Sequence, residues 1–104
     1  MPKRYTGEQE EVAVASRTRL KRPPLYKAVL HNDDFTTMDF VIYVLQTVFG
    51  RTDTEAITIM LAVHTEGSGV AGIYTLEVAE MKAAKVIEMA QTHEYPLLCT
   101  VEEG

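Results

Sequence analysis

Cysteine is scarce in this sequence, and that scarcity limits the possible folds and compartments. Cys99 is the only cysteine among 104 residues, so no disulfide can form within the chain. The first 24 residues also lack the apolar stretch of roughly 7–15 residues that a secretory signal requires. We therefore expect a cytoplasmic protein without disulfides, in which Cys99 is a buried structural thiol.

Long hydrophobic runs are missing too. The longest covers only residues 40–45, whereas a helix needs roughly 18 or more apolar residues to span a bilayer. Hydrophobic residues nevertheless make up 46% of the chain and charged residues 24%, which is the balance of an ordinary globular domain. We expect one domain at residues 23–104, preceded by a flexible arm at residues 1–22, and no interaction with membranes.

Sequence signatures of catalysis are absent. The chain has no glycine-rich phosphate loop, nucleophile elbow or metalloprotease helix. Its three histidines, His31, His64 and His93, lack the spacing of a zinc site. An enzyme in which His64 and Asp34 act together as a base would still lack a nucleophile and a cofactor site. We therefore expect a protein that is not an enzyme and that needs neither metal nor cofactor.

Negative charge is concentrated in the body of the chain. The net charge is −5, yet residues 1–22 contain six Lys/Arg and three Asp/Glu, whereas residues 23–104 contain four and twelve. An acidic body repels nucleic-acid phosphates, so we expect no nucleic-acid binding outside the short basic segment at residues 17–22. Cationic or amine-bearing partners suit this surface better.

Local signals predict six elements in the order β-α-α-β-α-β. Strands are expected over residues 25–30, 70–75 and 96–101, and helices between Thr36 and Gly50, between Thr52 and Gly67, and over residues 77–93. Thr36 is expected to cap the first helix, and Thr52 with Glu55 forms a capping box for the second. The fold class is α+β, with three helices packed against a small three-stranded antiparallel sheet.

Three further signals concern packing and strand position. The third helix has small apolar residues on one stripe, which predicts close packing against the sheet: Ala79, Ala83, Val86 and Ala90. Gly72 either weakens its strand or permits close backbone approach. The last strand is entered through Pro96, which fits an edge of the sheet or the start of a strand.

One polar cluster is predicted beside an apolar hollow. The loop after the first strand contains Asn32, Asp33 and Asp34, and His64 ends an apolar helical run. Together these groups would offer acceptors to a cationic donor. The hollow beside them would be lined by Met38, Val41, Met60 and Val63. A plainer interpretation stays open, because Asn and Asp are common turn residues and a histidine in a last helical turn complements the helix dipole.

Several strings, in this order, resemble the ClpS family of adaptors of the bacterial N-end rule pathway: PPLYKAVLHNDDFTTMDFVIYVL, MLAVH, GVAGIYTLEVAEMKAAKV and YPLLCT. The resemblance extends from about Pro23 to Glu102. It implies a non-enzymatic adaptor that binds proteins by a hydrophobic N-terminal residue, namely Leu, Phe, Tyr or Trp. Such an adaptor delivers them to the ClpA unfoldase of the ClpAP protease, and its fold resembles the β-α-α-β-α-β order.

The resemblance also implies roles for individual residues. The substrate's α-amino group would be bound by Asn32, Asp33, Asp34 and His64, with Asp34 acting through water. The hydrophobic side-chain pocket would contain Thr36, Met38, Val41, Met60, Val63 and Leu97. Glu77 and Lys82 would face the N-terminal domain of the unfoldase, and residues 1–22 would take part in delivery.

Thr37 is the main departure from the family pattern, because many members have proline at this position. Proline would stiffen the turn before Met38, a residue that the resemblance implies excludes β-branched side chains. The alternative function is a modulator of the unfoldase with the same fold but without amine recognition. A peptide that loses binding when its N-terminus is acetylated would distinguish the two.

Overall fold

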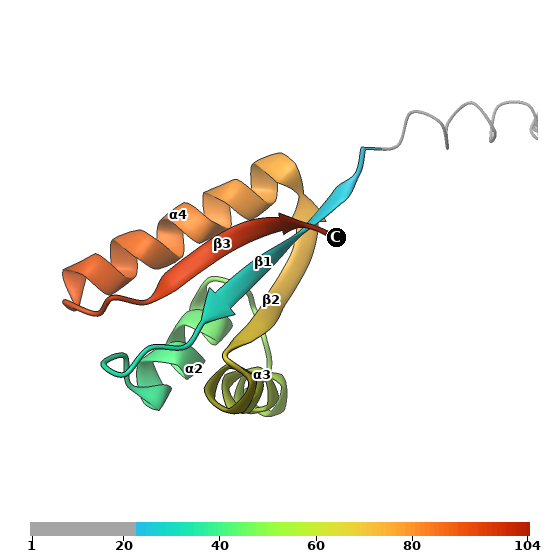
Figure 1. Ribbon diagram of the computed structural model, residues 1–104. Coiled ribbons are helices and arrows are strands. Elements are labelled where there is room, and N and C mark those ends of the chain that lie inside the picture. Colours follow the sequence, from blue (N-terminus) through green and yellow to red (C-terminus); the bar gives the residue numbers. More distant parts are fainter. Residues whose placement is uncertain (1–22) are drawn as a thin grey trace, which may run out of the picture.

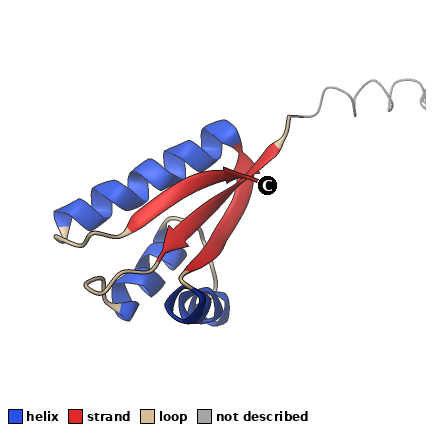
Figure 2. Cartoon of the chain, viewed as in Figure 1, coloured by secondary structure: helices blue, strands red, loops and turns tan. Residues whose placement is uncertain are grey.

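The computed structural model describes residues 23–104, so the predicted arm at residues 1–22 lies outside the described part of the chain. Its elements are β1 (Leu25–His31), α2 (Met38–Thr47), α3 (Asp53–Glu66), β2 (Ser68–Thr75), α4 (Leu76–Thr92) and β3 (Leu98–Glu103). The predicted order β-α-α-β-α-β and the α+β fold class are confirmed (Figures 1 and 2). No helix within residues 23–104 is long and apolar enough to cross a membrane.

The sheet is antiparallel, and its strand order is β2-β1-β3. The last strand, β3, is therefore at an edge, as expected, but it begins at Leu98 and not at the predicted Pro96, which lies outside the strand. Ala28 pairs with Gly72 and Val29 pairs with Val70, so Ala71 is an extra residue that forms a bulge in β2. This pairing could not be derived from local signals, because it depends on segments more than 40 residues apart.

The three helices form two groups around the sheet, α4 in one and α2 with α3 in the other. α4 contacts all three strands, whereas α3 contacts β2 and α2 contacts α3. Figure 1 shows α4 alongside the sheet, with α2 and α3 together near the end where β1 finishes. The predicted stripe of α4 is buried: Ala79, Ala83, Val86 and Ala90. Its small side chains let the helix lie close to the strands.

The helix starts are set by threonine caps, one of which differs from the prediction. The capping box of Thr52 and Glu55 is confirmed, and Gly67 ends α3 with a φ of 94°. Thr36 does not cap α2. The N-cap is Thr37, whose Oγ1 accepts a hydrogen bond from the Phe40 amide at 3.1 Å. Thr36 is instead bonded to Asp33 in the preceding loop, so the helix begins one residue later.

Gly72 illustrates why the second strand needs a glycine. A Cβ atom at this position would overlap the ring of Tyr74. A close approach to the Gly72 backbone is therefore present, and the group that approaches is the side chain of Tyr74. Cys99 is buried in β3, as expected, and burial raises the pKa of its thiol to about 11.

Candidate functional site

A cavity of about 210 Å³ brings together the loop after β1, the start of α2 and the last turns of α3. Its lining includes all but one of the residues predicted to form the site: Asn32, Asp33, Asp34, Thr36, Met38, Val41, Met60, Val63 and His64. These residues come from two segments about 25 positions apart, so the fold is what assembles the cavity. The structure places the residues together, while the role of each stays a prediction.

Leu97 is the predicted pocket residue that the structure does not bring to this lining. It is 4% exposed and belongs to the hydrophobic core. The chain passes there from α4 into β3, and an apolar side chain at that entry is buried among core residues. The cavity therefore gives no support for contact between Leu97 and a ligand.

The loop after β1 is held by the carboxylate of Asp33. Its Oδ1 accepts hydrogen bonds from the amides of Phe35 at 2.8 Å and Thr36 at 2.7 Å, and its Oδ2 accepts one from the Thr36 hydroxyl at 2.8 Å. The sequence analysis missed this structural role. The available signal was an aspartate followed closely by free amides and a threonine, which is typical of an Asx turn.

These hydrogen bonds also fix the charge of Asp33. Partial burial alone would raise the pKa of its carboxyl, but the bonds from Thr36 and Phe35 outweigh that effect and hold the pKa below its ordinary value. Asp33 is thus a permanent negative charge at neutral pH. It contributes electrostatically to the cavity while its oxygens bind the loop.

A backbone hydrogen bond joins the loop to α3. The Asn32 amide donates to the carbonyl of Gly67 at 2.9 Å, and the Gly67 amide donates to Val63 in the last turn of α3. This connection places Asn32 beside the helix end that presents His64. Within residues 23–104, the side chains of Asn32, Asp34 and His64 make no hydrogen bond to the protein, so their polar atoms are available to a ligand.

The apolar half of the cavity is formed by α2 and α3. Val41, Met60 and Val63 are buried, and they provide the inner walls. Met38, the first residue of α2, is 44% exposed and therefore lies at the mouth. Methionine side chains adapt to both aliphatic and aromatic shapes, so these walls suit bulky apolar groups of several kinds.

Acceptors and a negative charge next to an apolar hollow can bind a cationic donor that is attached to an apolar group.

The described residues contain no group of three or more His, Cys, Asp or Glu that could hold a metal ion. The raised pKa of Cys99 also keeps that thiol protonated and unreactive at neutral pH.

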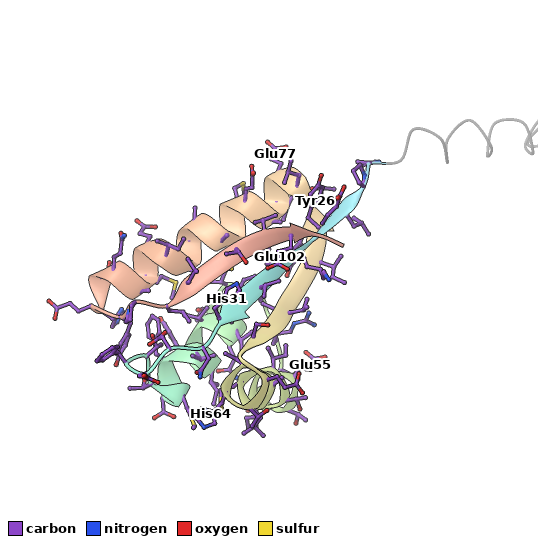
Figure 3. The ribbon with its side chains drawn as sticks, viewed as in Figure 1. Tyr26, His31, Glu55, His64, Glu77 and Glu102 are labelled. Carbon is purple, nitrogen blue, oxygen red and sulfur yellow. The ribbon has the colours of Figure 1, made fainter. Side chains whose placement is uncertain are left out.

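Glu77 and Lys82, predicted to face the unfoldase, both lie on α4 and do not line this cavity. Glu77 is exposed in the first turn, and Figure 3 shows it at the opposite end of the molecule from His64. The Lys82 amine donates to the carbonyl of Val48 at 2.9 Å and lies 5.2 Å from the centre of the Tyr74 ring. Lys82 therefore also satisfies a backbone carbonyl at the C-terminal end of α2.

A second and wider hollow, of about 570 Å³, lies between α2 and α4 and includes Lys82. The residues around it are Tyr43, Thr47, Val48, Met81, Lys82, Lys85 and Met89. The sequence analysis did not identify this hollow, because it depends on where the fold places α2 and α4 relative to each other.

The fold and the first cavity define a small α+β domain with a cavity at the junction of a loop and two helices. The chain belongs to the ClpS family, since the family described as ATP-dependent Clp protease adaptor protein ClpS matches residues 21–100. The predicted resemblance is thereby confirmed.

Relatives from several bacteria are similar over nearly the whole chain, and each is named ATP-dependent Clp protease adapter protein ClpS. The Roseobacter denitrificans relative is 47% identical over 88% of this chain and 81% of its own length. The Shewanella piezotolerans relative is 47% identical over 95% and 97%, respectively. A solved structure, Agrobacterium tumefaciens ClpS2 bound to L-phenylalaninamide, is 35% identical with a TM-score of 0.77, covering 80% of this chain and 100% of that one.

Proposed function

We propose that this Clp protease adaptor binds proteins whose N-terminal residue is Leu, Phe, Tyr or Trp and delivers them to the ClpA unfoldase of the ClpAP protease. The observation that best supports this proposal is the composition of the cavity. Its polar side contains acceptors without a hydrogen-bonded partner within residues 23–104, on Asn32, Asp34 and His64. Its apolar walls are Met38, Val41, Met60 and Val63. One half suits an α-ammonium group, and the other suits the first side chain.

The chemistry of the α-amino group explains how the site would distinguish the N-terminus of a protein from an internal peptide group. A free N-terminal ammonium has three donors and a positive charge, whereas an internal peptide N–H has one donor and no charge. An acceptor that is desolvated without a partner costs roughly 1–3 kcal/mol. A site with several such acceptors therefore rejects ligands without a free N-terminus.

The ligand of the Agrobacterium relative has both required parts. L-Phenylalaninamide carries a free α-amino group and a benzyl side chain on the same carbon. That pairing corresponds to the polar and apolar halves of the present cavity, and this likeness supports the proposal.

In this proposal, Asn32 and His64 accept hydrogen bonds from the ammonium directly. Asp34 acts through water, and Asp33 adds negative charge while holding the loop. Thr36 borders the side chain of the bound residue at the polar edge. Glu77 and Lys82 face the N-terminal domain of ClpA, and residues 1–22 act during delivery.

Reconstituted degradation tests the delivery step. A reporter protein with an N-terminal Leu should be degraded by ClpAP much faster when this chain is added, whereas the same reporter with an N-terminal Ser should not respond. A variant lacking residues 1–18 should still bind a Leu-initiated peptide within about twofold of wild type, yet lose most of the acceleration, because the arm has no expected role in the pocket. If the chain altered both reporters equally, it would be a general modulator of the unfoldase.

A further inference from the structure

The outer face of α3 has exposed apolar side chains that packing within the domain does not explain. Ile57 and Leu61 are 45% and 47% exposed, and they lie four residues apart on one side of the helix. Between Glu55 and Glu66 the helix contains no Asp, Glu, Lys or Arg. A helix that buries only one stripe normally presents charged residues on the other. We call Ile57 and Leu61 the α3 strip.

The strip is continuous with the cavity. His64 lines the cavity and follows Leu61 by three residues, so the two side chains are neighbours on the helix surface, with Cβ atoms about 5–6 Å apart. Ile57 is one further turn away from His64, and neither strip residue lines the cavity itself. The strip therefore starts at the His64 rim and leads away from it along α3.

We propose that the α3 strip binds apolar side chains at the second and fourth positions of a peptide whose first residue occupies the cavity. The inference rests on the proposed function, because it needs the peptide's α-amino group beside His64. Successive side chains of an extended peptide point to opposite sides, so its second and fourth side chains point the same way and lie about 6.6 Å apart. Leu61 and Ile57 are separated by about 6 Å along the helix, so these two peptide side chains can contact both strip residues. The uncharged surface favours apolar side chains at these positions over polar or charged ones.

Fluorescence anisotropy with two labelled peptides tests the proposal. Both begin with Leu and differ only at positions two and four, which are Leu and Phe in one (the Leu-Phe peptide) and Ser in the other (the Ser-Ser peptide). Wild type should bind the Leu-Phe peptide about three- to tenfold more tightly, because partial burial of two apolar side chains adds to binding. Leu61→Ser should remove most of this preference while binding the Ser-Ser peptide as wild type does. Ile73→Ser, which changes an exposed apolar residue of β2 outside the cavity, should retain the preference.

L-Leucinamide separates this inference from the proposed function, since it has only a first residue. It should compete equally well on wild type and Leu61→Ser. If it binds but the preference persists in both Ile57→Ser and Leu61→Ser, the strip is not the subsite and the inference is wrong. The inference would also be wrong if Phe35→Ser removed the preference as fully as Leu61→Ser does. Phe35 lies on the loop after β1 and is not part of the α3 strip. A third result would also overturn the inference: sedimentation shows that wild type is a dimer, Leu61→Ser dissociates it, and the peptide preference stays unchanged. If neither L-leucinamide nor any peptide binds wild type, the proposed function has failed first.

Discussion

Asp33 and His64 border the same cavity, but their surroundings give them different roles. Three hydrogen bonds within the loop occupy the carboxylate of Asp33. His64 is exposed in the last turn of α3 and has no hydrogen-bonded partner within residues 23–104. In the proposed function, Asp33 therefore sets mainly the shape and charge of the site, and His64 contacts the ligand directly.

His64→Ala should weaken binding of a Leu-initiated peptide, because an imidazole nitrogen can accept a hydrogen bond from the ammonium and an alanine side chain cannot. The expected loss is about tenfold or more at pH 7.5, with an unchanged circular dichroism spectrum. An affinity within about twofold of wild type would remove His64 from this role.

Asp33→Ala should lower stability at neutral pH and loosen the loop. Because the folded-state pKa of Asp33 is lowered, its contribution is fully present above its unfolded value of 3.8 and is lost as the pH falls through the folded value. The loss at pH 7 should be about 1 kcal/mol, since the bonds are partly exposed to solvent. Urea unfolding at pH 7 and pH 3 measures it. A difference from wild type that is undiminished at pH 3 would contradict an ionic origin.

Met38→Ala should widen the specificity of the cavity. Met38 lies at the mouth, where it can exclude side chains branched at Cβ, such as Ile and Val, by their shape. Leu and Ile have equal volumes, so their discrimination depends on a steric wall. The variant should bind Ile- and Val-initiated peptides better and Leu-initiated peptides nearly as before. A uniform loss for all peptides would show that Met38 is only a general wall.

At the scale of elements, local sequence signals placed the strand ends within two residues, whereas they gave the wrong cap for α2. The capping box at Thr52 and the left-handed Gly67 are local features, and both were predictable. The start of α2 was not, because Thr36 and Thr37 are both good caps and the choice depends on which one Asp33 binds. Resemblance and loop chemistry together predicted most of the cavity lining.

Thr37→Pro tests how the start of α2 controls the mouth of the cavity. Thr37 has a φ of −74°, which proline accepts, but the substitution removes the cap to Phe40. The lost cap costs about 1 kcal/mol, and the stiffer unfolded chain offsets roughly half or more of it. Stability should change little, while discrimination of Leu from Ile should sharpen because the turn before Met38 is fixed. Thr37→Ala is the matched control and should lower the melting temperature without sharpening discrimination.

At the scale of the whole molecule, the cavity and the first turn of α4 lie apart, and they have different proposed partners. Its 17 residues extend over about 25 Å, from Glu77 in its first turn toward the far end of the sheet. Figure 3 shows Glu77 and His64 at opposite ends of the molecule. An adaptor with this arrangement can hold a substrate in the cavity while the α4 surface contacts the unfoldase. Sequence signals alone could not predict this separation or the groove between α2 and α4, because both depend on how distant elements pack.

The central claim is that the cavity recognises a free α-amino group attached to a bulky apolar side chain. Isothermal titration calorimetry with one Leu-initiated peptide, in its free and Nα-acetylated forms, tests it most directly. Acetylation removes the charge and two donors while leaving every side chain in place. The free peptide should bind at least about tenfold more tightly, since each unpaired acceptor costs roughly 1–3 kcal/mol. Equal affinities for the two forms would contradict the account.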